Sequence, residues 1–140
     1  MKPVPAFTIP LILLAGLAAG CSGSEGSGRS VEIGETFLLK MGESVRVGDN
    51  LRLIFERVAD DSRCPEGVQC VTEGNARVNL KYITPDHPPL DFSLNTMRTL
   101  SRDTAIQHYR IALADLTPRP KAGTEIQPGE YQAQLRVTRE

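Results

Sequence analysis

The sequence contains no tryptophan, and aromatic residues make up only 5% of its 140 residues. Proteins that stack nucleic-acid bases on their surface need such side chains. Basic and acidic residues are nearly balanced, at 16 against 17. Removing residues 1–20 takes away only the charge of Lys2, which leaves 15 against 17 and a formal charge of −2. This balance gives no strong attraction to nucleic acid or to an anionic membrane surface, so we expect no nucleic-acid partner.

Motifs for catalysis are also missing. The sequence has no Gly-x-Ser-x-Gly motif, which presents the nucleophile in one large class of hydrolases. His87 and His108 are its only histidines, and neither has a cysteine or a carboxylate at the spacing of a metal-binding motif. We therefore expect no enzymatic activity and no cofactor.

The apolar run at residues 7–19 is too short to cross a bilayer as a permanent helix, which needs about 20 apolar residues. It contains Pro10, follows the positive charge of Lys2 and ends in small residues. These features are typical of a secretory signal peptide. The alternative is a helix in the core of the mature domain, which the prolines of this segment disfavour. We expect residues 1–20 to be a signal peptide.

Residues 17–21, Leu-Ala-Ala-Gly-Cys, resemble the lipobox of bacterial lipoproteins. In that family a diacylglycerol is attached to the cysteine sulfur, the chain is cut just before the cysteine, and the new amino terminus is acylated. This chain departs from the usual pattern at Ala18, where leucine is common. The resemblance implies that Cys21 is lipidated, with palmitate among its acyl chains, and anchors the protein in a lipid bilayer. The alternative is ordinary secretory cleavage near Ala19, which leaves a free thiol.

Residues 21–30 comprise Cys21 and a run rich in glycine and serine that has no apolar residue to bury. We expect this segment to be a flexible tether between the anchor and the domain. In diderm bacteria, the sorting rule of the lipoprotein family would send a chain with Ser22 after the cysteine to the outer membrane. The expected location is therefore the outer membrane, facing the periplasm, if the organism is diderm.

From residue 31 onward, apolar and polar residues alternate with period two, and turn residues recur at short intervals. This pattern predicts strands rather than helices. Seven strands are expected, at residues 36–41, 44–47, 51–58, 74–82, 90–95, 109–116 and 129–137. Residues 84–89 include three prolines and are expected to interrupt the pairing, because proline has no N–H to donate.

An antiparallel β-sandwich buries one apolar face of each strand between its two sheets, which fits this pattern. We therefore predict that residues 31–140 form an all-β, immunoglobulin-like sandwich. A small closed barrel is the alternative.

Cys64 and Cys70 enclose five residues, which include Pro65 and Gly67. An exported protein meets an oxidising compartment, where a disulfide is the usual state of two nearby cysteines. With Cys21 lipidated, these two cysteines pair without remainder. Two alternatives remain open. A redox pair usually has only two residues between its cysteines, and a zinc site would need two further ligands.

The residues around this loop also resemble a known family. Asp-Ser-Arg-Cys-Pro at residues 61–65, followed by a second cysteine at position 70, looks like a family of small, uncharacterised bacterial lipoproteins. The resemblance covers roughly residues 35–137. Members of that family typically have a tryptophan soon after the second cysteine, where this chain has Val-Thr-Glu at residues 71–73. The resemblance implies a membrane-attached β-domain and supplies no activity.

Four charged residues lie in or beside the same loop: Asp60, Asp61, Arg63 and Glu66. Two interpretations are open. The group is an ion-binding or partner-binding cluster, or it is the solvated tip of a loop in which Asp61 and Ser62 cap a turn. We take Asp61, Arg63 and Glu66 as the candidate contact residues.

Together these expectations describe a membrane-anchored lipoprotein whose domain is a non-catalytic binding or envelope-structural module. Its partner would be a protein or another envelope ligand. The alternative is a periplasmic metal-handling protein that uses His87, His108 or the carboxylates of the loop.

Overall fold

In the computed structural model, which describes residue 3 and residues 28–140, one sheet contains five strands. They are β1 (Ser30–Val31), β3 (Ser44–Val47), β4 (Leu51–Ala59), β5 (Arg77–Thr84) and β6 (His87–Asn95), arranged in the order β1-β3-β4-β5-β6. β1 is parallel to β3, and the other neighbours are antiparallel. The edges of this sheet are therefore the two-residue β1 and the longer β6.

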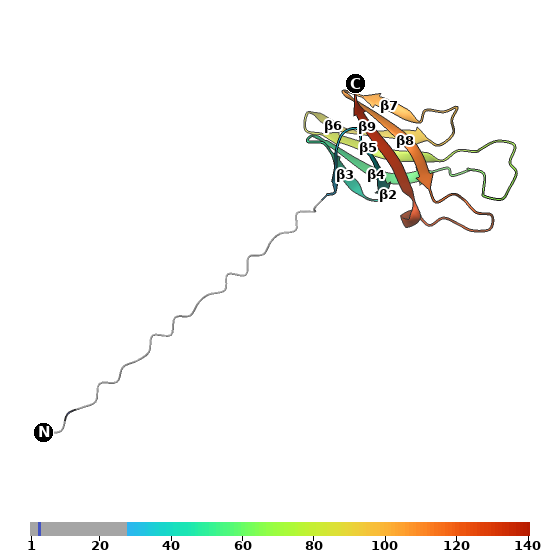
Figure 1. Ribbon diagram of the computed structural model, residues 1–140, viewed down its shortest axis with the longest axis horizontal. Helices are drawn as coiled ribbons and strands as arrows, with labels where there is room; N and C mark the ends of the chain where they lie inside the picture. The colour runs from blue at the N-terminus through green and yellow to red at the C-terminus, as the bar shows by residue number, and fades with distance from the viewer. Residues whose placement is uncertain (1–2, 4–27) are drawn as a thin grey trace.

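The second sheet contains four strands, all antiparallel. They are β2 (Thr36–Lys40), β9 (Gln132–Arg139), β8 (Tyr109–Thr117) and β7 (Asp103–Ile106), arranged in the order β2-β9-β8-β7. A single 3₁₀ turn, η1 (Pro128–Glu130), precedes β9. The two sheets pack against each other (Figure 1), so the predicted sandwich is confirmed.

Alternate residues of the strands fill the space between the sheets. In β4, Leu51, Leu53 and Phe55 are fully buried, whereas Arg52 and Glu56 are exposed. The neighbouring strands follow the same rule, and their buried side chains include Val78, Leu80 and Tyr82 of β5, Ile111 and Leu113 of β8, and Ala133, Leu135 and Val137 of β9. The period of two that predicted strands is thus the period that builds the core.

The described residues form nine strands where the sequence predicts seven. β1 has only two residues, and β7 has no fully buried side chain. Both strands lie at sheet edges, where little alternation is left to detect. The last strand also begins later than predicted, since η1 includes residues 129 and 130.

The prediction that residues 84–89 interrupt the pairing is wrong for their second half. β6 begins at His87, pairs this residue with Thr84, and includes Pro88 and Pro89. β6 is an edge strand, and Pro88 and Pro89 lie where its register with β5 shifts, between Tyr82 and Thr84. Proline is tolerated at both an outer edge and a bulge, because neither needs a regular N–H donor. Leu90, which the alternation places inward, is 48% exposed.

The longest connections between strands gather at one end of the sandwich, which we call the loop end. They are residues 60–76 between β4 and β5, 96–102 between β6 and β7, and 118–131 between β8 and β9. Shorter turns at 48–50, 85–86 and 107–108 lie at the opposite end. Because β1 is parallel to β3 and Ser30 pairs with Arg46, the described chain runs from Gly28 toward the turn at 48–50. Gly28 itself lies beside Ser44, at the level of Ile54 in the middle part of β4. In Figure 1 the long loops extend from one side of the sandwich.

Candidate functional site

Residues 60–76, which we call the cysteine arm, leave and re-enter the sheet through a narrow neck. The backbone N–H of Ser62 donates to the carbonyl of Asn75 at 2.7 Å, and the N–H of Cys64 donates to the carbonyl of Glu73 at 3.0 Å. The Ser62 hydroxyl also donates to the Asn75 carbonyl, at 3.0 Å. These bonds continue the antiparallel pairing of β4 and β5 into the arm, so the base of the arm has a defined direction.

Gly74 allows the two sides of the neck to approach. Its φ of +68° lies in the left-handed region, and a Cβ at this position would be 1.9 Å from the carbonyl oxygen of Ser62. Any side chain would therefore collide with backbone rather than with a flexible group. The glycine is required by the geometry of the neck itself.

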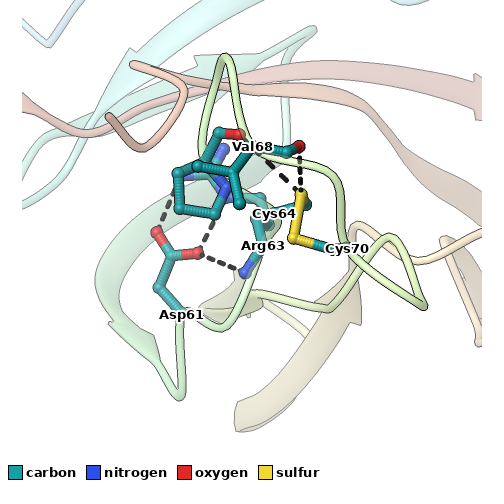
Figure 2. The surroundings of a disulfide bond; sticks show 6 residues. Asp61, Arg63, Cys64, Val68 and Cys70 are labelled. Carbon is teal, nitrogen blue, oxygen red and sulfur yellow. Dashed lines mark hydrogen bonds and ion pairs between the residues drawn. A yellow bond between two sulfur atoms is a disulfide. The ribbon is translucent and has the colours of Figure 1, made fainter. Parts of the chain in front are cut away.

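Beyond the neck, Cys64 and Cys70 form a disulfide, with their Cα atoms 5.9 Å apart (Figure 2). This separation lies within the range usual for disulfides. The bond closes the outer part of the arm. The N–H of Glu66, inside the closed loop, donates to the carbonyl of Pro120 at 2.8 Å, and Glu66 also forms a parallel bridge with Lys121. The closed loop therefore lies against the 118–131 connection.

The side chain of Arg63 turns inward and binds Asp61 through two bonds. Nε donates to Oδ1 of Asp61 at 2.8 Å, and Nη2 donates to Oδ2 at 2.7 Å (Figure 2). Oδ1 also accepts the backbone N–H of Arg63, at 3.3 Å. The two side chains are only 10% and 13% exposed. The solvated-tip interpretation therefore does not hold for Asp61 and Arg63, whereas Glu66 is exposed and Asp60 forms a surface ion pair with Arg77.

The same guanidinium reaches across to the end of β8. Nη1 of Arg63 donates to the carbonyl of Leu116 at 2.6 Å, and Nη2 donates to the carbonyl of Pro118 at 2.9 Å. A charged donor makes stronger hydrogen bonds than a neutral one. Arg63 therefore joins the base of the cysteine arm to the other sheet.

Tyr131, between η1 and β9, completes this network by donating its hydroxyl to Oδ2 of Asp61 at 2.9 Å. Burial would by itself raise the pKa of Asp61, but the hydrogen bonds and charge of Arg63 and the bond from Tyr131 outweigh it and leave the pKa below the ordinary 3.8. Burial, followed by the bond to the Asp61 carboxylate, raises the pKa of Tyr131 to about 12. Asp61 is thus an anion and Tyr131 a neutral donor across the physiological range.

A second arginine binds β8 in a similar way. β7 pairs with β8 only as far as Ala112, so the carbonyls beyond it have no strand partner on that side. Nη2 of Arg102 donates to the carbonyls of Leu113 and Ala114, at 3.2 and 2.6 Å. Arg102 and Arg63 together occupy the open edge of β8 with side-chain donors.

The outer part of the arm, from Glu66 to Glu73, is exposed to solvent. It carries two apolar side chains, Val68 at 45% exposure and Val71, which is fully exposed. The arm therefore presents acidic and apolar groups outward, on a base that is held by buried bonds.

The other candidate residues lie elsewhere. His87 begins β6, and His108 is in the turn between β7 and β8, so both lie at the end opposite the cysteine arm. In the part of the chain that the structure describes, no cluster of three or more histidine, cysteine, aspartate or glutamate side chains is placed to hold a metal ion. Cys21 lies outside the described residues.

Sequence reasoning missed Tyr131, Arg102 and the carbonyls of β8 as members of this network. Tyr131 contacts Asp61 across 70 positions of sequence, and Arg63 contacts Leu116 across 53. Such contacts have no local spacing, and backbone acceptors have no residue type that marks them. A tyrosine next to a Pro-Gly-Glu turn was the only local signal, and it also fitted a core position.

Comparison with known protein families, with curated proteins and with solved structures found no match for this chain. Among the residues that the structure describes, none forms a helix with the length and apolar character needed to cross a membrane.

We expect Gly74→Ala to destabilise the domain much more than Gly67→Ala does. Both glycines have positive φ, but a Cβ at Gly67 meets nothing within 4 Å. Gly67→Ala should lower the free energy of unfolding by about 1–2 kcal/mol, the cost of the left-handed conformation. Gly74→Ala should exceed this by about 2 kcal/mol or more, because the backbone of the neck must also move. Urea unfolding measures both variants, and equal losses would contradict the account of the neck.

Asp61→Asn should change the pH dependence of stability at its acid limb. The pKa of Asp61 is lowered in the folded protein, so its contribution is present above about 3.8 and is lost as the pH falls through the folded value. The variant should be less stable at pH 7 by about 3 kcal/mol, since Arg63 loses its counter-ion. It should also lose less stability than the wild type between about pH 4 and pH 2.

The control is Asp60→Asn, because Asp60 is 76% exposed in its pair with Arg77. Its stability at pH 7 should stay within about 0.5 kcal/mol of the wild type. Denaturant midpoints at several pH values give the result. An unchanged acid limb in Asp61→Asn would refute the role assigned to this carboxylate.

Proposed function

We propose that the protein is an exported lipoprotein, anchored through acylated Cys21, whose β-sandwich is a non-catalytic binding module in the bacterial envelope. The loop end is the surface that meets the partner. With Ser22 after the cysteine, the outer membrane is the favoured location if the organism is diderm. The partner is a protein or another component of the envelope.

The observation that supports this proposal most directly is the position of the chain entry. Ser30 pairs with Arg46 at the end of the sandwich where β4 begins, and the cysteine arm follows the far end of β4, at Ala59. β4 runs from Leu51 to Ala59, which corresponds to roughly 30 Å at about 3.3 Å per residue. Since β1 is parallel to β3, Gly28 lies level with Ser44 and Ile54, and the cysteine arm extends beyond Ala59, further along β4. A tether that leads to Gly28 would therefore join the domain away from the tip of the arm and leave that tip free to meet a partner.

The construction of the cysteine arm supports a binding role for that end. Its base is fixed by Arg63 and by the bonds of the neck, and its outer part is closed by a disulfide. A loop that is already ordered loses less conformational freedom when a partner binds. The exposed side chains of Val68 and Val71 provide apolar area on this ordered arm. Binding loops held on a rigid sandwich are a common arrangement.

The anchoring step is tested with Cys21→Ser. This variant should no longer incorporate radioactive palmitate and should leave the membrane fraction, because the acylated sulfur is missing. The control is the double variant Cys64→Ser and Cys70→Ser, which makes the same substitution at the other two cysteines and should still be labelled. Labelling that survives in Cys21→Ser would overturn the lipoprotein assignment.

The binding surface is tested by photo-cross-linking in the cells that produce the protein. p-Benzoylphenylalanine at Val71, on the arm, should give discrete adducts of higher mass after irradiation. The matched position is Asp49, which is also exposed but lies in the turn at the opposite end. We expect no comparable adduct from Asp49. Adducts from Asp49 alone, or from neither position, would contradict the assignment of the loop end.

A further inference from the structure

A polar depression of about 530 Å³ lies beside the neck of the cysteine arm. The neck, the 96–102 connection and the end of β8 all contribute to its walls. Its charged lining residues are Arg63, Arg98, Arg102, Arg119, Glu73 and Asp115. Four arginines thus face two acidic residues, although the chain as a whole has 16 basic and 17 acidic residues.

Arg63 and Arg102 bind β8 alike but differ in their counter-ions. The guanidinium of Arg63 donates to two carbonyls and is also paired with the carboxylate of Asp61. The guanidinium of Arg102 donates to two carbonyls, and within the described residues no carboxylate lies within 4.0 Å of it. Its Nε is buried and, among the same residues, has no acceptor. A partly buried cation bonded only to neutral groups is stabilised by a nearby anion.

Two further arginines, Arg98 and Arg119, line the same depression and make few interactions with the rest of the described chain. No side-chain hydrogen bond of Arg98 occurs in the described part of the chain, where only its backbone N–H is engaged, by Glu73. Arg119 makes a single long ion pair with Asp115, at 3.8 Å, and is 66% exposed. Guanidinium groups match carboxylate and phosphate oxygens with two parallel donors. Arg98, Arg102 and Arg119 therefore surround a space that suits an oxyanion.

We propose that this depression binds a phosphate or carboxylate group. The bound anion is the counter-ion of Arg102, as Asp61 is the counter-ion of Arg63. The inference rests on the proposed function, since it names the chemistry of a ligand at the loop end. The depression lies between the neck of the cysteine arm and the end of β8, and the anion comes from a soluble molecule or a bound partner. A lipid headgroup carries the same chemistry, and the test separates that source. Arg98 and Arg119 close over the anion from the rim.

The test uses the full chain in a non-ionic maltoside detergent. Inorganic phosphate and citrate are titrated separately at constant ionic strength, with chloride as the balancing ion, and arginine Nε–Hε and backbone amide signals are followed by NMR. Saturable shifts should appear at Arg98, Arg102 and Gly74 with phosphate, citrate or both. Stronger binding of one anion identifies the oxyanion type.

The variant that tests the rim is the double change Arg98→Gln and Arg119→Gln, which leaves the bonds of Arg63 and Arg102 to β8 intact. It should raise the dissociation constant by about tenfold or more, because two charge-assisted contacts are lost. The control is Arg52→Gln with Arg139→Gln, which removes the same charge from exposed positions in β4 and β9 away from the depression. It should change the constant by less than about twofold.

Three outcomes would overturn the inference. One is a response to phosphate and citrate no greater than to chloride, and another is equal weakening by the two double variants. The third is binding of Cys21→Ser to phosphatidylglycerol vesicles that Arg98→Gln with Arg119→Gln abolishes, which would make the ligand a lipid surface. If adducts form at Val71 while no anion binds, this inference fails and the proposed function stands.

Discussion

The guanidinium of Arg63 joins three segments that are far apart in the sequence. It binds Asp61 within the cysteine arm and the carbonyls of Leu116 and Pro118 at the end of β8, and through Asp61 it is linked to Tyr131 ahead of β9. Burying a guanidinium without a partner costs several kcal/mol. Asp61, only two residues away, provides that partner. Both members of the ion pair that holds the arm against β8 therefore come from the arm itself. The direction of the cysteine arm at the loop end depends on this ion pair and on the bonds of Arg63 to β8.

Arginine side chains recur where strand edges lack a neighbour. Arg63 and Arg102 occupy carbonyls of β8, and Nη1 of Arg29 donates to the carbonyl of Leu38 in the edge strand β2, at 2.9 Å. An unpaired edge offers hydrogen-bonding groups to other chains, and proteins commonly block it with charge or proline. In the edge strand β6, Pro88 and Pro89 have no N–H to donate and so hinder pairing with another chain. Two of the edge strands, β2 and β6, and the open end of β8 are therefore blocked by side chains rather than by further strands.

The sandwich was predictable because its signal is local. Alternating residues such as Leu51, Leu53 and Phe55 must face one side of a strand, and two such faces must meet. The edge strands were harder, because β7 buries no side chain fully and β6 begins in a proline-rich segment. The network around Arg63 was out of reach. Its spacing of 53 residues to Leu116 and its backbone acceptors leave no pattern in the sequence, and only the pairing of Asp61 with its near neighbour is short-range.

The disulfide and Arg63 fix different parts of the arm. The ring closed by Cys64 and Cys70 begins beyond the neck, so it restricts the outer residues and leaves the base to Ser62, Gly74 and Arg63. Closing so short a ring contributes about 2 kcal/mol in the chain-entropy model. Opening it would loosen the exposed tip that holds Val68, while the buried pair of Arg63 and Asp61 would still direct the arm. The direction of the loop end is therefore set by buried electrostatics, and the shape of its tip by the covalent bond.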